Sequence, residues 1–160
     1  MAALKIKLSC IEDDHMRLTY LTDFSLRVLM YAGSMPRRLV TIQEIAGAYG
    51  ISENHLMKVV HGLAQQGFIE TVRGHGGGIR LSRPATEITV GSVIRAVEDD
   101  FALVECFRTD NTCRITPVCR LRGALQEALG AYFEVLDNWT LAELVAKPKA
   151  LLNELAPPEA

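Results

Sequence analysis

The chain opens with three stretches in which apolar residues recur at helical spacing. They cover residues 22–33, 41–50 and 52–67, and each has a residue near its start that can act as an N-cap. Thr19 or Thr22 can cap the first stretch, and a capping-box pattern opens the second. The second and third stretches are short and are separated by a tight turn that contains glycine. Together they predict a helix-turn-helix.

The pattern after the third helix predicts a β-hairpin. Residues 68–72 and 79–82 have the composition of two strands, and the segment 73–78 between them contains four glycines. A hairpin that follows a helix-turn-helix is a wing, and its glycines let the backbone approach a DNA groove closely. A nucleotide-binding loop would instead follow a strand and open a helix, so the sequence excludes nucleotide binding here.

The second half of the chain is predicted to be helical around one polar loop. A helix begins after Thr89 and stops near residues 98–100, and sustained helical periodicity covers residues 121–136. Thr140 caps a short helix that follows. The long helix is apolar along one stripe, and we expect it to pack on the same helix of a second copy. The predicted fold class is mainly α, with a winged helix-turn-helix domain, a long C-terminal dimerisation helix and a cysteine-bearing cluster loop.

These patterns divide the chain into four segments. Residues 1–15 are expected to be an N-terminal extension, and Met16 could be the natural start. The winged helix-turn-helix DNA-binding domain covers residues 16–83. The cluster-binding loop and the dimerisation helices cover residues 84–146. The proline- and alanine-rich end, 147–160, is expected to be a flexible tail.

The composition is that of a folded protein without a membrane segment. The 160 residues are 49% hydrophobic and 22% charged. No apolar run approaches the roughly 18 residues that a membrane span needs, and the N-terminus lacks the pattern of a secretory signal. We therefore expect a cytoplasmic protein with no membrane partner. The cytoplasm keeps thiols reduced, so clustered cysteines indicate metal or redox chemistry more than structural disulfides.

The net charge of -2 conceals an uneven distribution of charge. Residues 16–83 carry eight Lys or Arg against four Asp or Glu, a balance of +4, whereas residues 84–160 carry seven against twelve, a balance of -5. We expect double-stranded operator DNA to bind the first half, where side chains can reach base edges and phosphates. The candidate DNA-contacting residues are Ser52, Asn54, His55 and Lys58 in the third helix and Arg73, His75 and Arg80 in the wing.

Three of the four cysteines lie in the predicted loop. Six residues separate Cys106 from Cys113, and five separate Cys113 from Cys119. Thiolates favour zinc, copper(I) or iron-sulfur clusters, and paired zinc ligands usually lie closer together, so an iron-sulfur cluster fits this spacing better. Three unrelated thiols, or a disulfide with one cysteine left over, are the alternatives that spacing leaves open. Cys10 lies far from the loop in sequence and is assigned no role.

Nothing in the sequence indicates an enzyme. The chain contains no Cys-x-x-Cys redox pair and no arrangement of serine, histidine and aspartate that predicts a catalytic triad. The four histidines, His15, His55, His61 and His75, lie in the N-terminal extension or in the DNA-binding half. We therefore expect a DNA-binding protein without catalytic residues.

Several motifs together resemble one family of regulators. They are the opening at 16–23, Asn54-His55, the wing at 73–81, the loop ending Cys113-Arg114-Ile115-Thr116-Pro117-Val118-Cys119, and Leu136-Asp137-Asn138-Trp139-Thr140. With them, the chain resembles the nitric-oxide-sensing iron-sulfur repressors among the BadM/Rrf-type winged-helix regulators. The resemblance implies a homodimer with a [2Fe-2S] or [4Fe-4S] cluster on Cys106, Cys113 and Cys119. It also implies repression of nitric-oxide detoxification genes, with release of the operator when nitric oxide nitrosylates the cluster.

The resemblance leaves the fourth cluster ligand to be assigned. The cluster-biogenesis regulator of the same superfamily has a histidine ligand three residues past its last cysteine, where this chain has Arg122, which cannot ligate. Asp23 matches a carboxylate ligand of the nitric-oxide-sensing repressors, donated across the dimer, and Glu98 or water are the alternatives. A hard oxygen ligand is easily displaced, which suits a site that admits a diatomic gas.

Two other functions fit the same architecture. A regulator that senses iron-sulfur supply or redox state would use the same winged helix-turn-helix domain and cysteine loop. A structural zinc site on the three thiols would make the chain a constitutive DNA-binding module. In the nitric-oxide case, we expect the cluster to tie the cysteine loop to the first helix and so to fix the separation of the two recognition helices.

Overall fold

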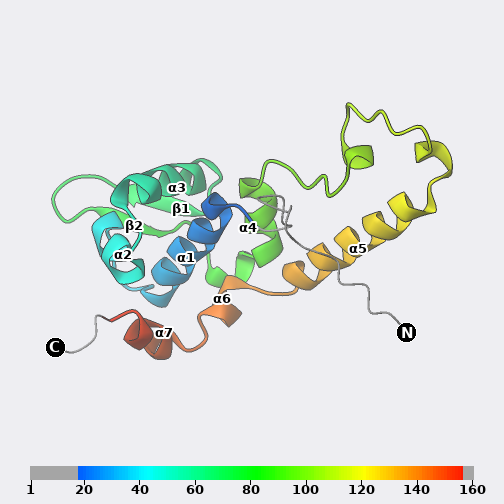
Figure 1. Ribbon diagram of the computed structural model, residues 1–160. Helices are drawn as coiled ribbons and strands as arrows, with labels where there is room; N and C mark the ends of the chain where they lie inside the picture. Colours follow the sequence, from blue (N-terminus) through cyan, green and yellow to red (C-terminus); the bar gives the residue numbers. More distant parts are fainter. Residues whose placement is uncertain (1–17, 157–160) are drawn as a thin grey trace, which may run out of the picture.

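A computed structural model describes residues 18–156, which form a mainly helical protein with one small sheet (Figure 1). The first half contains α1 (Tyr20–Ser34), α2 (Ile42–Tyr49), α3 (Glu53–Gln65), β1 (Ile69–Val72) and β2 (Gly78–Leu81). The second half contains α4 (Val90–Val97), α5 (Arg120–Asp137), α6 (Leu141–Leu144) and α7 (Pro148–Glu154). Short 3-10 turns occupy Ala85–Glu87, Glu105–Phe107 and Thr116–Val118. The predictions for residues 1–15, including Cys10 and His15, and for a start at Met16 lie outside the described residues.

We call α1, α2, α3 and the β1–β2 hairpin the head, and its helices begin at hydroxyl caps. Thr19, rather than Thr22, caps α1, because its Oγ1 accepts a hydrogen bond from the Thr22 amide at 3.3 Å. Helix α1 therefore begins at Tyr20, slightly earlier than the apolar pattern predicts. Ser52 caps α3 in the same way, by accepting a hydrogen bond from the His55 amide at 3.3 Å.

Helix α2 is capped by Thr41, but the predicted capping box is only half formed. Thr41 Oγ1 accepts a hydrogen bond from the Glu44 amide at 3.1 Å. Among the described residues, the Glu44 carboxylate binds the Arg38 guanidinium and the Tyr31 hydroxyl instead, the latter at 2.9 Å. The hydrogen bonds from Arg38, helped by the one from Tyr31, hold the pKa of Glu44 below its usual value. This carboxylate therefore links α2 to α1.

Helix α1 lies at the centre of the molecule. Its Val28 and Leu29 side chains are fully buried, and the helix packs against α3 and β2 of the head and against α4, α6 and α7 of the second half. The wing is an antiparallel hairpin, and Val40 pairs with Ile79 beside it, which fixes the hairpin on the head. The mainly α winged helix-turn-helix fold predicted from the sequence is confirmed.

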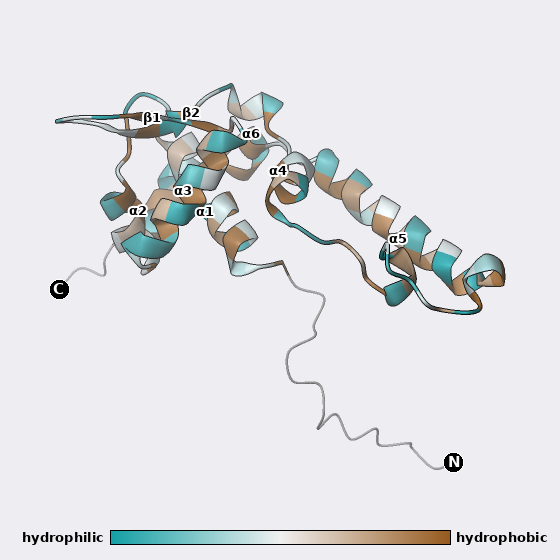
Figure 2. Cartoon of the chain, turned by 90° about the horizontal axis from the view of Figure 1, so that it is seen from above, coloured by the Kyte–Doolittle hydropathy of each residue, from teal (hydrophilic) through white to brown (hydrophobic). Residues whose placement is uncertain are grey.

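Helix α5 projects away from the head (Figure 1) and buries none of its residues. The segment after α4 leads out to the far end of α5, where the chain turns back into the helix. Figure 2 shows apolar and polar residues alternating around α5, and Leu121 and Tyr132 on its apolar stripe are 64% and 41% exposed. The apolar stripe predicted for this helix is therefore largely uncovered. In residues 18–156, no helix has the length and apolar character needed to cross a membrane.

The prediction of a flexible tail over residues 147–160 is wrong where α7 forms. Pro148 occupies the first turn of this helix, where the missing N–H of proline has no consequence. Leu151, Leu152 and Leu155 pack against the core, and α7 lies against α1 (Figure 1). The burial of these leucines outweighs the proline- and alanine-rich composition that indicated a tail.

The substitution Leu151→Ser should lower the free energy of unfolding by about 1–3 kcal/mol, because it removes apolar contact between α7 and the core. The matched control is Lys149→Ser on the exposed side of the same helix, which should change the free energy by about 0.5 kcal/mol or less. Urea unfolding followed by circular dichroism measures both values. Equal stability of the two variants would contradict the packing of α7 on the head.

Candidate functional site

The start of α3 presents four of the predicted DNA contacts on one exposed surface. Ser52 caps the helix, and Asn54, His55 and Lys58 follow it, all four exposed to solvent. The four buried residues of α3 face the core, which fixes the rotation of the helix about its axis. The His55 ring also lies 6.5 Å from the ring of Phe24 on α1, measured between centroids. The structure therefore brings these four side chains together.

Met57 shares this surface and was not among the predicted contacts. Its side chain is 50% exposed, and it lies three residues after Asn54, on the same side of the helix. The three-residue spacing from Asn54 could have predicted this exposed position, but a methionine at helical spacing is ordinarily a core residue. An exposed methionine beside DNA-contacting residues can make an apolar contact with the methyl group of thymine.

The wing presents Arg73 and His75 at its exposed tip. The glycines that follow each of them have φ values of 100° and 80°, a left-handed conformation that favours glycine. Arg80 lies further down the hairpin, directly across from Glu70, and forms an ion pair with it. The charge of Arg80 is therefore partly neutralised, whereas within residues 18–156 neither Arg73 nor His75 forms an ion pair.

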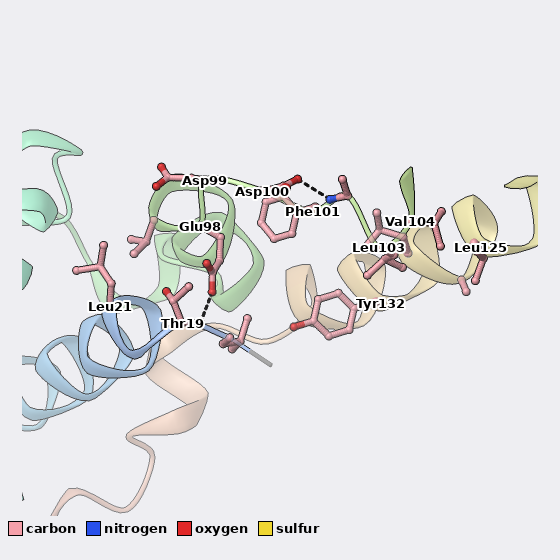
Figure 3. Close-up of a pocket in the computed structure, with 15 residues that line it drawn as sticks. Thr19, Leu21, Glu98, Asp99, Asp100, Phe101, Leu103, Val104, Leu125 and Tyr132 are labelled. Carbon is pink, nitrogen blue, oxygen red and sulfur yellow. Dashed lines mark hydrogen bonds between the residues drawn. The ribbon is translucent and has the colours of Figure 1, made fainter. Parts of the chain in front are cut away.

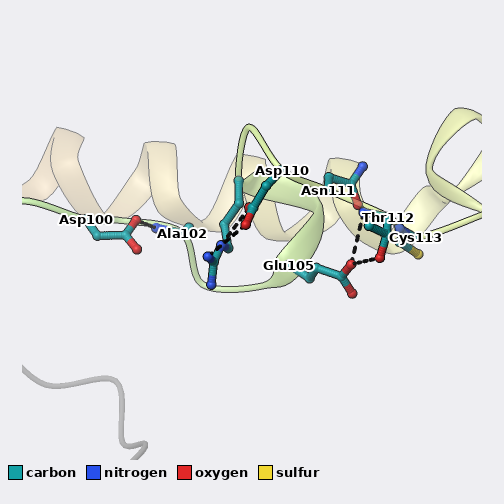
Figure 4. Close-up of polar contacts among 8 residues, drawn as sticks. Asp100, Ala102, Glu105, Asp110, Asn111, Thr112 and Cys113 are labelled. Atoms are coloured by element: carbon teal, nitrogen blue, oxygen red, sulfur yellow. Dashed lines mark hydrogen bonds and ion pairs between the residues drawn. The ribbon is translucent and has the colours of Figure 1, made fainter.

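Hydrogen bonds shape the loop that carries the cysteines (Figure 4). The Glu105 carboxylate accepts hydrogen bonds from the Thr112 amide at 3.0 Å and from the Thr112 hydroxyl at 2.6 Å, and these bonds hold the pKa of Glu105 below its usual value. Asn111 Oδ1 accepts a hydrogen bond from the Cys113 amide at 3.0 Å. Two distant parts of the loop are thereby joined.

The backbone of each cysteine takes part in this network. The Cys106 carbonyl accepts a hydrogen bond from Arg122 Nε at 3.2 Å, and the Cys113 carbonyl accepts one from Thr116 Oγ1 at 2.8 Å. The Cys119 amide donates to the Thr116 carbonyl at 3.4 Å. Within residues 18–156, none of the side-chain hydrogen bonds involves a cysteine sulfur. Hydrogen bonds between side chains and the backbone therefore hold the loop, and the thiols are left available.

The three thiols are free and half-buried, but one chain does not gather them into a metal site. In the part of the chain that the structure describes, no group of three or more His, Cys, Asp or Glu side chains is placed to hold a metal ion. The donor set suits an iron-sulfur cluster, which proteins hold with cysteine thiolates. Completing such a site would require the loop to close and a fourth donor to come from outside it.

Both candidate oxygen ligands lie near the start of α1, whereas the cysteine loop extends to the far end of α5 (Figure 1). Asp23 is half-exposed in the first turn of α1, and its Oδ2 forms an ion pair with Arg27 Nη2 at 2.8 Å. Glu98 ends α4, and its Oε1 accepts a hydrogen bond from the Thr19 amide at 2.6 Å. The structure therefore places these two carboxylates close to the same helix terminus and brings neither into a site with the cysteines.

An open groove of about 890 Å³ lies between the start of α1, the segment after α4, and α5 (Figure 3). Leu21, Leu103, Leu125 and Tyr132 contribute apolar side chains to its walls, and the three acidic residues 98–100 also line it. Leu21 and Tyr132 are both more than 40% exposed, at 42% and 41%. The groove is therefore apolar inside and carries a concentrated negative charge.

One family of known proteins matches most of the chain. The Rrf2 family, described as iron-dependent transcriptional regulators, matches residues 18–147. The chain belongs to the Rrf2 family. The predicted membership of the BadM/Rrf-type regulators is therefore confirmed.

Relatives of this Rrf2 chain are transcription regulators. It is 50% identical to the HTH-type transcriptional regulator NsrR of Bacillus subtilis (strain 168) over 142 residues, which cover 88% of this chain and 97% of the relative. It is 49% identical to NsrR of Geobacillus kaustophilus (strain HTA426), over 87% of this chain and 98% of the relative. The solved structure of T. potens IscR has the same fold, with a TM-score of 0.66 and 23% identity over 89% of this chain and 93% of that chain. The Rrf2 chain is a helix-turn-helix transcription regulator and not an enzyme, as the sequence predicts.

The substitution Gly78→Ala tests how the wing is seated on the head. A Cβ at this position would lie 2.6 Å from the Val40 carbonyl oxygen, so the backbone would have to move and the Val40–Ile79 pairing would be lost. The free energy of unfolding should fall by about 1–3 kcal/mol. In the control Gly47→Ala, the new methyl group meets nothing within 4 Å, and this helical position should gain about 0.5–1 kcal/mol. Thermal unfolding distinguishes the two, and a Gly78→Ala variant as stable as the control would rule out this contact.

Proposed function

We propose that this regulator is a nitric-oxide-responsive repressor that binds operator DNA as an iron-sulfur homodimer and controls nitric-oxide detoxification genes. The observation that carries the proposal is a loop with three free thiols attached to a DNA-binding head. A head of this kind needs no thiols to bind DNA, so the loop indicates a regulatory group. The extensive identity with relatives named NsrR supports the same assignment.

In this proposal, Cys106, Cys113 and Cys119 hold the cluster, and Asp23 of a second copy supplies the fourth donor, with Glu98 or water as the alternatives. When bound, the cluster supplies iron that can bind nitric oxide in place of a weak oxygen ligand. Asp23 suits such a role because its ion pair with Arg27 is at the surface, with 42% and 41% of the two side chains exposed. Exposed ion pairs contribute little stability, so the carboxylate can change partner at small cost.

The head would bind operator DNA with α3 in the major groove and the wing against the backbone or the minor groove. In that position the exposed Asn54 would pair with adenine, and the exposed Lys58 would reach guanine or a phosphate. Arg73 and His75 extend the contact at the tip of the wing. Arg80 contributes less than these two, because Glu70 already neutralises part of its charge.

The uncovered surface of α5 supports a homodimer. At the far end of the helix, Val118 and Leu121 are 80% and 64% exposed, next to the basic side chains of Arg114, Arg120 and Arg122. The groove at the near end is apolar and acidic. Two antiparallel α5 helices would therefore place the basic, apolar tip of each chain on the acidic, apolar groove of the other. A two-fold axis satisfies both contacts at once.

The description of the Rrf2 family as iron-dependent favours a second candidate function. A regulator of iron-sulfur supply or of redox state would use the same head, loop and dimer. The two functions differ in the signal and in whether the chain binds its operator without a cluster.

Anaerobically purified protein should contain iron and inorganic sulfide, and nitric oxide should release it from its operator. The substitution Cys113→Ser should abolish the visible absorbance of the cluster and weaken operator binding by about 5- to 150-fold, the usual range of coupling between two sites. The control Thr109→Ala alters an exposed residue of the same loop and should preserve both properties. Absorbance spectra and gel-shift titrations at matched salt measure them.

Each failure of that experiment has a different meaning. Tight operator binding by cluster-free protein would favour the second candidate function. Zinc without colour or sulfide would indicate a structural zinc site. An operator complex that survives nitric oxide would refute the proposed signal.

Substitutions on α3 test the assigned DNA contacts. Lys58→Ala should weaken binding to all sequences and reduce the slope of log affinity against log salt by about 1, because one phosphate contact is lost. Asn54→Ala should cost about 1–3 kcal/mol on the operator and relax the preference at one base pair. Gln65→Ala, at the exposed opposite end of the helix, is the control. Unchanged affinity of all three variants would place the DNA elsewhere.

A further inference from the structure

Helices α4 and α5 meet at a joint built around one ion pair. The two terminal nitrogens of Arg95 donate to Asp137 Oδ1 and Oδ2 at 2.6 and 2.7 Å, so the pair is bidentate and has a defined direction. These hydrogen bonds hold the pKa of Asp137 below its usual value. The Arg95 guanidinium also lies 4.2 Å from the centre of the Phe133 ring on α5. Phe133 in turn packs edge-on against Phe101, with 4.9 Å between ring centroids.

Gly91 allows the two helices to come this close. A Cβ at this position would lie 2.0 Å from Asp137 Oδ1, so any other residue would push the carboxylate away from Arg95. The backbone continues the joint, because the Val90 amide donates a hydrogen bond to the Trp139 carbonyl at 2.9 Å. The angle between α4 and α5 is therefore determined by backbone contacts together with one bidentate pair.

Helix α4 is also fixed to the head. At its end, Glu98 accepts a hydrogen bond from the Thr19 amide, which precedes α1, and α4 packs along α1. Helix α1 packs against α3, the proposed recognition helix. The joint therefore sets the direction in which α5 leaves the head (Figure 1).

We propose that the Arg95–Asp137 joint sets the separation of the two recognition helices, one α3 from each copy. The joint thereby makes the dimer selective for the spacing of its DNA half-sites. This inference rests on the proposed function, in which α5 pairs with α5 of a second copy. One added base pair moves a half-site by about 3.4 Å and rotates it by about 35°. A rigid joint penalises that displacement, whereas a loose joint tolerates it. Arg95 and Asp137 are positioning residues that act through α5.

A positioning role and a merely stabilising role predict different results. The side chains of Arg95 and Asp137 are 44% and 43% exposed, and exposed ion pairs contribute little to the free energy of folding. Loss of the pair should therefore leave the melting temperature and the dimer unchanged while it widens the range of accepted spacings. A stabilising role would lower the melting temperature and leave the spacing preference unchanged.

The test uses the full-length protein in its DNA-binding form and an operator that the wild type selects from random-sequence DNA. Affinity is measured for this operator and for the same operator with one base pair inserted at its centre. The wild type should lose at least about tenfold in affinity on insertion. The Asp137→Asn variant should lose less than about threefold. The control Glu134→Gln, which removes the same charge from an exposed position of α5, should behave as the wild type.

The substitution Gly91→Ala provides an independent variant, because it displaces the Asp137 carboxylate sterically and keeps both charges. It should show the same reduced penalty as Asp137→Asn, and it decides the matter if Asp137→Asn fails to fold. Equal penalties in the wild type and in the folded variants would overturn the inference, as would a wild type that binds both operators equally. A wild type that selects no operator, or that is a monomer, would instead refute the proposed function.

Discussion

The burial of α1 is the constraint on which the rest of the molecule depends. Val28 and Leu29 are fully buried, and the same helix packs against α3 and β2 in the head and against α4, α6 and α7 in the second half. Full burial of each such side chain contributes about 1.5–3 kcal/mol. Because both halves share one helix, a displacement of α4 acts on the packing of α3 through α1. Under the proposed function, a signal bound by the cysteine loop would therefore act on the DNA-binding head through α1.

The sequence predicts those elements whose determinants lie within a few residues of one another. The caps at Thr41 and Ser52, the left-handed turn at Gly50 with a φ of 65°, and the wing all follow from local patterns. The sequence does not predict helix α7, because a helix of seven residues is too short to be stable alone. Its leucines form a helix only against the core. The sequence leaves the start of α1 open because both Thr19 and Thr22 are acceptable caps. The burial of Thr22, which depends on tertiary packing, decides between them.

The candidate site divides in the same way between local and distant determinants. The spacing of the cysteines predicts the donor set and a polar loop, and the hydrogen bonds of Glu105, Asn111 and Thr116 hold that loop. The spacing cannot bring the thiols together, because free thiols attract one another only weakly and these hydrogen bonds decide the shape of the loop. The position of the two candidate carboxylates at the start of α1 and the pairing of residues 42 positions apart at the α4–α5 joint depend on tertiary packing.

The head and the cysteine loop are held by different forces, and this difference separates stability from response. The head is stabilised by apolar burial, which does not depend on a ligand. The loop is held mainly by hydrogen bonds, and its apolar residues Ile115 and Val118 are 60% and 80% exposed. A typical hydrogen bond contributes only about 0.5–1.5 kcal/mol to a folded structure, so rearranging a few of them costs about as much as the 1–3 kcal/mol that couples two sites in a regulator. A change in the loop can therefore reach α1 through Glu98 and α4 without any loss of the fold that reads DNA.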